Sequence, residues 1–420
     1  MVNVKRSRKT SFWQAWIAPW QEIDWFLLFI VVGLTGFGGI MIRSTELNFG
    51  WTDWWQHWLM GGLSLILALV LARMRYEHLL RWQWWIYGVT CLSLVAVRFA
   101  GTSALGAQRW ISIGGFHVQP SEFAKVGAII VLAANLSVTT ASSLEAVFRT
   151  LMIIAVPWAL VFLQPDLGTS LVFGAITLVM LYWAEAHWGW LVLMISPLVS
   201  AILFGVWLPG WFIWLVLVMI LAYFSLPEWR ISPLIALVTN LLSGGLGNWF
   251  WLNLLKEYQR DRLILFLDPD KDPLGGGYHL IQSRIAIGAG QLWGQGLYQG
   301  TQTQLNFIPE QHTDFIFSAI GEELGFVGSG LLIFVYWLLC LRLVIIAQNA
   351  KDNFGSLIAI GVLAMILFQL VVNIGMNIGL APVTGIPLPW ISYGRSALLT
   401  NFIAIGLVES VFNYRSRPKF

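Results

Sequence analysis

Apolar runs long enough to cross a bilayer recur along almost the whole chain, and they restrict the fold more than any other feature. A membrane-crossing helix needs about 20 mainly apolar residues, because backbone polar groups in lipid must bond within the structure. Only 11% of the residues are charged, whereas a soluble domain carries about 25%. The sequence therefore predicts an all-α polytopic membrane protein with about twelve transmembrane helices. Candidate spans lie at 24–42, 54–72, 82–100, 122–138, 149–163, 168–184, 188–207, 210–226, 231–255, 315–341, 356–378 and 394–413.

Basic residues mark one side of the predicted membrane domain. They precede the first span, follow the second and close the chain, as in Lys5, Arg6, Arg73, Arg75, Arg415, Arg417 and Lys419. Lysine and arginine accumulate in cytoplasmic loops, and an even number of spans puts both ends of the chain on one side. We therefore expect a cytoplasmic basic N-terminus at 1–23 and a cytoplasmic tail at 414–420.

One long polar segment, residues 256–314, separates the first nine predicted spans, within 24–255, from the last three, within 315–413. It is rich in glycine and carries charges of both signs. Loops of this length are usually functional or disordered, and its apolar run LILFLDP argues against disorder. The count of spans places it outside the membrane. We expect this extracytoplasmic loop to be the catalytic surface of the protein.

Polar residues also gather at the predicted outer end of the fourth span. Glu122 and Lys125 are three residues apart, so they share one face of the helix. Ser121 is expected to cap this helix, and Arg109 and Trp110 lie in the preceding outer turn. A lone pair of this kind can be an interfacial ion pair whose lysine reaches towards water. A simple ion pair explains Glu122 and Lys125 less well once Arg109 and Trp110 lie nearby, so we also consider a binding site here.

Several carboxylates lie close to predicted hydrocarbon, where a charge is costly and is usually functional. Asp166, in LQPDLGTS, is expected to cap the helix that follows it, and this role is compatible with a functional one. Asp314 is expected at the start of the tenth span. Glu322 and Glu323, two turns further along, are either functional groups or a polar contact between helices.

Familiar motifs of soluble enzymes are missing from the sequence. There is no P-loop, HExxH or GxSxG motif, and GAGQLWGQG lacks the spacing and the βαβ context of a nucleotide loop. Cys91 and Cys340 lie in apolar runs and predict neither a disulfide framework nor a metal site. We expect no nucleic acid partner. Outer carboxylates and cations around a membrane cavity suit an anionic, lipid-linked substrate at the outer leaflet.

Five motifs, in this order, make the chain similar to a known family. They are QPSEFAK (119–125), QPDLGTSL (164–171), FLDPDKDPLGGGY (266–278), IPEQHTDFIFSAIGEELG (308–325) and GIPLPWISYG (385–394). They resemble the SEDS family of bacterial shape, elongation, division and sporulation proteins. TQTQLNFIPEQHTDFIF is more similar to the RodA branch than to FtsW. The resemblance implies a ten-helix core, so two of the twelve spans form an extra hairpin, which we place within 185–255.

The resemblance also implies an activity and a location. It predicts a peptidoglycan glycosyltransferase that polymerises lipid II at the outer face of the bacterial cytoplasmic (inner) membrane during cell elongation and shape maintenance. A class B penicillin-binding protein is the implied partner, because it would supply the transpeptidase. Membrane lipid is the other expected contact.

Individual residues acquire roles from the same resemblance and from the chemistry of glycosyl transfer, which needs a base and cations for the departing pyrophosphate. Asp272, in DPLGGG, matches the catalytic aspartate of the family, as the base or as a ligand of a divalent cation, Mg²⁺ or Mn²⁺. Arg395 stands where the family usually has a second glycine, and a guanidinium binds pyrophosphate well. The expected substrate-binding residues are Arg109, Trp110, Glu122, Lys125, Asp166, Arg260, Arg262, Ser392 and Arg395.

Three other functions remain compatible with the residues. A flippase or transporter of lipid-linked oligosaccharides also has many spans, intramembrane glutamates and broken helices. A scaffold that recruits cell-wall enzymes is a further alternative, as is an FtsW-like division polymerase within the family. The charges concentrate at the outer side and no inverted repeat is visible, which favours an enzyme over a transporter. Costly intramembrane carboxylates favour an enzyme over a scaffold.

Overall fold

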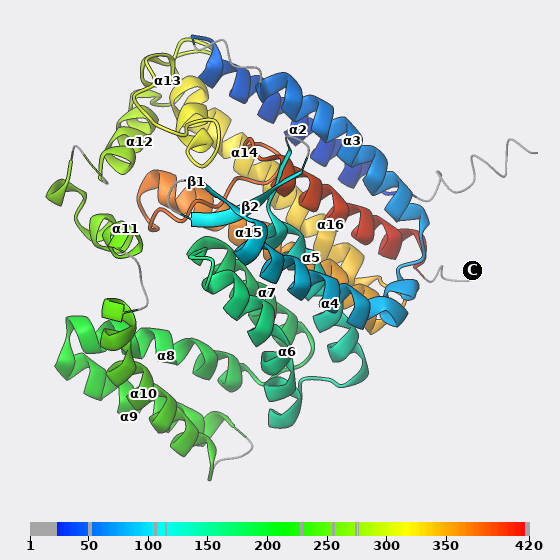
Figure 1. The fold of residues 1–420 in the computed structure, drawn as a ribbon, viewed down its shortest axis with the longest axis vertical. Coiled ribbons are helices and arrows are strands. Elements are labelled where there is room, and N and C mark those ends of the chain that lie inside the picture. The colour runs from blue at the N-terminus through cyan, green and yellow to red at the C-terminus, as the bar shows by residue number, and fades with distance from the viewer. Residues whose placement is uncertain are drawn as a thin grey trace, which may run out of the picture.

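The computed structural model describes residues 23–48, 53–104, 107–113, 116–226, 230–253, 257–273, 275 and 277–415. The predicted N-terminal segment 1–23 and tail 414–420 therefore lie almost entirely outside the described residues. Twelve of the described helices have 17 residues or more (Figure 1), and each overlaps one predicted span. The predicted polytopic helical fold is thus confirmed. These helices are α2 (Trp25–Glu46), α3 (Asp53–Arg73), α4 (Glu77–Ala100), α5 (Pro120–Val138), α6 (Leu144–Phe162), α7 (Leu167–Trp183), α8 (Trp188–Val206), α9 (Leu208–Ser225), α10 (Ser232–Asn253), α14 (Ile316–Gln348), α15 (Asn353–Ile378) and α16 (Arg395–Asn413).

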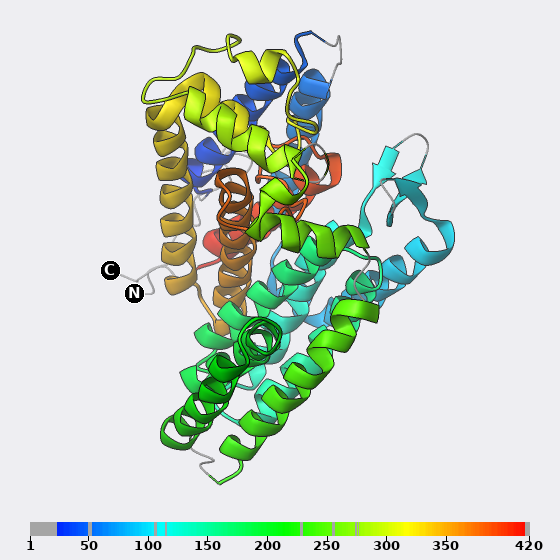
Figure 2. The ribbon, with the colours of Figure 1, turned by 90° about the vertical axis from the view of Figure 1, so that its left-hand side faces the viewer.

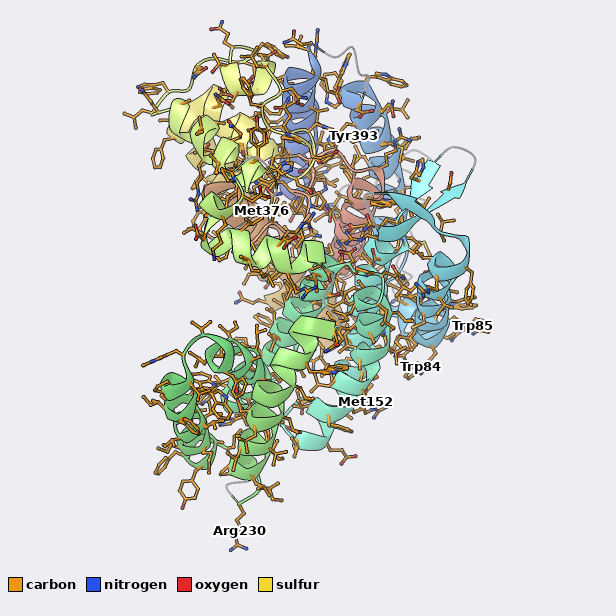
Figure 3. The ribbon with its side chains drawn as sticks, turned by 60° about the vertical axis from the view of Figure 1, so that its left-hand side comes forward. Trp84, Trp85, Met152, Arg230, Met376 and Tyr393 are labelled. Carbon is orange, nitrogen blue, oxygen red and sulfur yellow. The ribbon has the colours of Figure 1, made fainter. Side chains whose placement is uncertain are left out.

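The outside of the helical bundle is apolar, as a lipid-facing surface requires. Nine of the described helices are long and apolar enough to cross a membrane, and α7 and the stretch Ser232–Gly247 of α10 are shorter apolar segments. Trp84 and Trp85 on α4 and Met152 on α6 point away from the protein (Figure 3) and are exposed. The chain is therefore a multi-pass membrane protein whose exposed surface suits lipid.

The centre of the main bundle is formed where α5, α7 and α15 meet. Gly361 of α15 lies at this contact, and a Cβ placed on it would be 2.6 Å from Ile129 Cγ2 and 2.9 Å from Met180 Sδ. Only a residue without a side chain lets these three helices approach so closely. The contact helps to fix α5 relative to α7, and the N-terminal ends of both helices carry site residues.

Helices α8, α9 and α10 form a separate group beside the main bundle (Figure 1). The next helix along the chain is α11 (Glu257–Leu267). The group has an apolar core of its own and an internal hydrogen-bond network. Asn240 Nδ2 donates to Ser196 Oγ at 2.9 Å, and Trp211 Nε1 donates to Ser200 Oγ at 2.8 Å. The region 185–255, in which the sequence predicted an extra hairpin, forms this self-contained group, and that two of its helices are additional to the family core stays a prediction.

A small antiparallel sheet occupies the connection between α4 and α5, where the sequence predicted no strand. It consists of β1 (Thr102–Ala104), β2 (Ala107–Ile113) and β3 (Phe116–Val118), in that order. Ile111 of β2 pairs with Val118 of β3. The sheet stands out beyond the end of α4 (Figure 2). Because β3 leads directly into α5, the sheet places Arg109 and Trp110 beside the N-terminal end of that helix.

The long segment 256–314 contains its own short helices. They are α11, the 3₁₀ turn Pro269–Lys271, α12 (Tyr278–Ala289) and α13 (Thr301–Gln304). The following helix, α14, is interrupted at Gly325, whose φ of 67° is left-handed. The interruption exposes backbone groups that the loop satisfies. Gln295 N donates to Glu322 O at 2.9 Å, and Val327 N donates to Leu292 O at 3.0 Å.

Glu322 and Glu323 hold this loop against the bundle. The Glu322 carboxylate accepts hydrogen bonds from the backbone N–H groups of Gln302, at 2.8 Å, and Thr303, at 2.9 Å. Glu323 Oε1 accepts from Ser44 Oγ of α2 at 2.5 Å. A buried carboxylate with several donors is well satisfied. The structure therefore places these residues in polar contacts between elements, one of the two roles expected for them.

Candidate functional site

A cavity of about 560 Å³ lies among the N-terminal ends of α5, α7 and α16 and the long loop 257–314. Its charged lining comprises equal numbers of cations and carboxylates. These are Arg109, Lys125, Arg262 and Arg395, with Glu122, Asp166, Glu310 and Asp314. Trp110, His117, Gln119, Thr169, Thr313, Tyr393 and Ser396 complete most of its polar and aromatic wall. A partly enclosed polar site of this kind can bind charged groups of a substrate.

The first turn of α5 supplies a buried ion pair. Lys125 Nζ lies 2.8 Å from both carboxylate oxygens of Glu122, and the two side chains are only 1% and 5% exposed. The predicted shared helix face is confirmed. The expected cap at Ser121 is wrong, because the helix begins earlier, with Gln119 at the cap and Pro120 in the first turn. Proline is well suited to that position, since its fixed φ already matches a helix.

Asp166 caps α7, as predicted, and also lines the cavity. Its carboxylate accepts from Thr169 N at 3.2 Å and from Gln119 Nε2 at 3.3 Å, and Arg109 Nη1 lies 3.7 Å away. The cap therefore connects α7 with the start of α5 and with strand β2. A single carboxylate fixes three parts of the cavity wall relative to one another.

The carbonyl group of Pro165 brings α11 to the same place. It accepts hydrogen bonds from Arg109 Nη2 and from Gln259 Nε2, the latter at 3.2 Å. Pro165 has a φ of 27°, outside the usual range of proline. Gln259 is one helical turn from Arg262, which lines the cavity. This contact positions α11, and with it Arg262, against the helical bundle.

The start of α16 holds a second arginine. Arg395 Nη2 donates to Gln56 Oε1 of α3, and Arg395 Nε donates to the Tyr393 hydroxyl at 3.1 Å. Tyr393 OH donates in turn to Gln56 Oε1 at 3.3 Å. Burial raises the pKa of Tyr393, although the hydrogen bond from Arg395 opposes this, so the phenol remains a donor. Tyr393, labelled in Figure 3, lies with Arg395 in the cavity wall.

Asp314 is a cavity carboxylate to which the sequence assigned no role beyond a helix start. Helix α14 begins at Ile316, after a cap at Phe315, and Asp314 lies just before it in the cavity wall. Burial raises the pKa of Asp314 to about 6. The nearby charge of Arg262 opposes the rise, and Glu310 adds to it. This group therefore titrates close to neutral pH.

Most of the predicted substrate-binding residues meet in this cavity, and two do not. Arg260 lies on α11 but is not in the cavity wall. Ser392 is buried, and its hydroxyl accepts from Leu388 N at 2.8 Å, so it stabilises a turn. The predicted residues that line the cavity are Arg109, Trp110, Glu122, Lys125, Asp166, Arg262 and Arg395.

The predicted catalytic residue Asp272 lies outside the cavity, on an exposed turn of the long loop. Its Oδ1 accepts from Gly275 N at 3.0 Å. A Cβ on Gly275 would be 2.1 Å from Asp272 Oδ2, which explains a glycine at this position. The turn orders the carboxylate but does not bring it to the other site residues.

A metal site built by the protein is not found in the described part of the chain, which contains no group of three or more suitable His, Cys, Asp or Glu residues. Asp272 contributes one carboxylate, and nearby Asp268 pairs with Lys271 at 3.8 Å. Mg²⁺ is often held by one or two carboxylates together with substrate phosphates. A cation at Asp272 would therefore need the substrate for most of its ligands.

Comparison with known proteins covers nearly the whole chain. The model of the FtsW, RodA and SpoVE family, described as cell cycle proteins, matches residues 24–211 and 208–417. Peptidoglycan glycosyltransferase MrdB of Escherichia coli K12 is 36% identical over 354 residues, which cover 84% of each chain. Peptidoglycan glycosyltransferase RodA of Treponema pallidum is 34% identical, over 93% of this chain and 97% of that protein.

A solved structure agrees with these sequence comparisons. It belongs to a peptidoglycan synthase complex described as coordinating polymerization and crosslinking, and it superposes with a TM-score of 0.71 at 28% identity. The superposition covers 94% of this chain and 98% of the other. The helical architecture and the order of its elements are therefore shared along the full length.

Proposed function

This chain belongs to the FtsW, RodA and SpoVE family and is a peptidoglycan glycosyltransferase; we propose that it polymerises lipid II into glycan strands at the outer face of the bacterial cytoplasmic membrane. A solved structure that is 25% identical, with a TM-score of 0.62, is named rod shape determining protein RodA of Thermus thermophilus, and it supports a proposed role in cell elongation and shape. The observation that carries the proposal is the cavity at the outer ends of α5, α7 and α16, with four cations in its wall.

The chemistry required for chain growth matches what the cavity contains. The acceptor hydroxyl oxygen bonds to the anomeric carbon of the donor sugar while the bond from that carbon to the pyrophosphate oxygen breaks. The hydroxyl proton needs a base, and the departing pyrophosphate needs cations. We propose that Lys125, Arg262 and Arg395 bind the pyrophosphate, since arginine in particular forms strong paired bonds to phosphate oxygens. A single displacement of this kind inverts the configuration at the anomeric carbon.

A polymerisation assay with the purified protein tests the proposal. The protein, in detergent or nanodiscs, is incubated with lipid II, and the product is separated by gel electrophoresis. Glycan polymer is the expected product. We also propose a divalent cation, so EDTA should suppress the polymer, and Mg²⁺ or Mn²⁺ should restore it. Full activity in EDTA would contradict the proposed requirement for a divalent cation. A folded protein that makes no polymer, even with its partner present, would contradict the proposed polymerase activity.

A class B penicillin-binding protein is the proposed partner, and its contribution can be separated from that of this chain. The purified pair should make more glycan polymer than this protein alone. A β-lactam should then block cross-linking of the pair but leave the length of the glycan strands unchanged, because the transpeptidase site lies on the partner. Loss of glycan polymer when a β-lactam is added to this protein alone would contradict the division of labour.

Thiol labelling in intact cells tests the proposed topology, with the long loop outside and both termini in the cytoplasm. Gln299, in the long loop, and Asn349, between α14 and α15, are both exposed. In a background that lacks Cys91 and Cys340, Gln299→Cys should react with a membrane-impermeant reagent. Asn349→Cys should react only after the membrane is opened. The reverse labelling pattern would show that the long loop lies in the cytoplasm and would contradict the proposed topology.

A further inference from the structure

The position of Asp314 is fixed by a pair of asparagine side chains on α15. Asn373 Nδ2 and Asn377 Nδ2 donate to the Asp314 backbone carbonyl at 2.9 and 3.1 Å. Both asparagines are fully buried, and Asn373 Nδ2 also donates to Ile386 O at 2.8 Å. The anchoring bonds thus use the backbone of Asp314. They leave its carboxylate in the cavity wall.

A glycine, Gly385, lies beside this carboxylate. A Cβ on Gly385 would lie 3.4 Å from Asp314 Oδ2 and 3.9 Å from Arg262 Nη1. Gly385 also has a φ of 74°, which other residues adopt at a cost. A carboxylate and a guanidinium therefore flank the same small space beside a backbone without a side chain.

The charges that face Asp314 come from every side of the cavity. Arg262 of α11 and Arg109 of β2 favour its ionised form, while Glu310 of the same loop and Asp166 at the start of α7 oppose it. Burial is the largest of these influences, and it raises the pKa of Asp314. A carboxylate with a pKa of about 6 is a stronger base than an ordinary aspartate and is still mostly ionised at neutral pH, which suits proton transfer.

We propose that Asp314 is a further catalytic residue, which takes the proton from the acceptor sugar hydroxyl of the polymerisation reaction. The proposal rests on the proposed function. As the hydroxyl oxygen bonds to the anomeric carbon, its proton passes to the Asp314 carboxylate. The electrons of the broken bond leave with the lipid pyrophosphate, which the cavity cations bind. The carboxylic acid then loses its proton to water at the cavity mouth, and the base is restored.

This assignment gives Asp314 and Asp272 different tasks. Asp314 lies among the cavity cations, where a sugar hydroxyl beside the pyrophosphate would meet it. Asp272 lies on an exposed turn outside the cavity. Under this proposal proton transfer falls to the cavity carboxylate, and Asp272 would be the residue that holds the proposed divalent cation.

The dependence of the polymerisation rate on pH tests the proposal. Because the ionised form is the active one, the wild-type rate should rise as pH increases through about 6. Asp314→Asn should lower the rate by about 100- to 10,000-fold and remove this inflection, whereas Asp314→Glu should keep more activity than the asparagine variant. Lipid II binding by Asp314→Asn should stay close to wild type.

A second variant reports on the same group without replacing it. Glu310 adds to the raised pKa of Asp314, so Glu310→Gln should shift the inflection to lower pH. A wild-type profile without an inflection near 6, or Asp314→Asn with a wild-type rate, would overturn the inference. If Glu310→Gln does not change the pH of the inflection, the inference is also overturned. This test holds even if Asp314→Asn fails to fold. Absence of polymer from the wild type at every pH would instead contradict the proposed function.

Discussion

Asp272→Asn should nearly abolish polymerisation of lipid II, with a rate loss of at least about 100-fold, since losing even an outer partner of a metal ligand costs about 10- to 100-fold, while the protein folds and binds lipid II normally. The carboxylate is exposed, and the asparagine side chain can still accept the hydrogen bond from Gly275 N. Exposed substitutions of this kind change stability by no more than about 0.5 kcal/mol. Activity should therefore fall without a matching change in melting temperature or in elution on size exclusion.

Asp268→Asn is the matched control, because it makes the same change in the same loop. Asp268 pairs only loosely with Lys271, at 3.8 Å, and this variant should polymerise normally. If Asp272→Asn is active and Asp268→Asn is inactive, the assignment of the catalytic aspartate is wrong. A selective loss at Asp272 would show that this turn reaches the substrate during the reaction, since it does not line the cavity here.

Lys125→Met should destabilise the protein by about 3–5 kcal/mol, because it leaves the buried carboxylate of Glu122 without its partner. The pair has 2.8 Å contacts and almost no exposure. Replacing both residues, as in Glu122→Gln with Lys125→Met, removes the charges together and should recover much of the lost stability. Unfolding of the single and double variants in mixed micelles measures the difference.

Lys351 provides the control for this second experiment. Its ammonium group lies 2.8 Å from Glu77 Oε1, the same distance as in the buried pair, but the two side chains are 43% and 28% exposed. Exposed pairs contribute about 0–1 kcal/mol, so Lys351→Met should have a small effect. Equal losses from Lys125→Met and Lys351→Met would mean that burial does not govern the strength of the Glu122–Lys125 pair.

Features set by nearby residues were predictable from the sequence. Every long helix was expected, because each is an apolar run that lipid requires to be helical. The pairing of Glu122 with Lys125 follows from their spacing on one helix. Asp166 was recognised as a cap from its place before a helix. Strands β1 and β3 have only three residues each, too few to show an alternating pattern.

Features set by distant residues were not predictable. Asp314 is placed by Asn373 and Asn377, about 60 positions further along the chain. The motif HTDF marked this region by resemblance, but no local pattern shows that a helix-start aspartate faces Arg262. The exclusion of Asp272 and Arg260 from the cavity likewise depends on how α11 and the following turn pack against the bundle. Such contacts belong to the tertiary structure alone.

The equal numbers of cations and carboxylates in the cavity wall have a consequence for how a ligand arrives. Opposite charges this close together cancel at distances beyond the mouth, so the site projects little electric field into the surrounding water, and dissolved salt has little to screen. Capture from afar is not needed for a molecule already confined to the membrane plane. Recognition then depends on short-range contact. The cavity cations must exchange their carboxylate neighbours for the phosphate oxygens of the ligand.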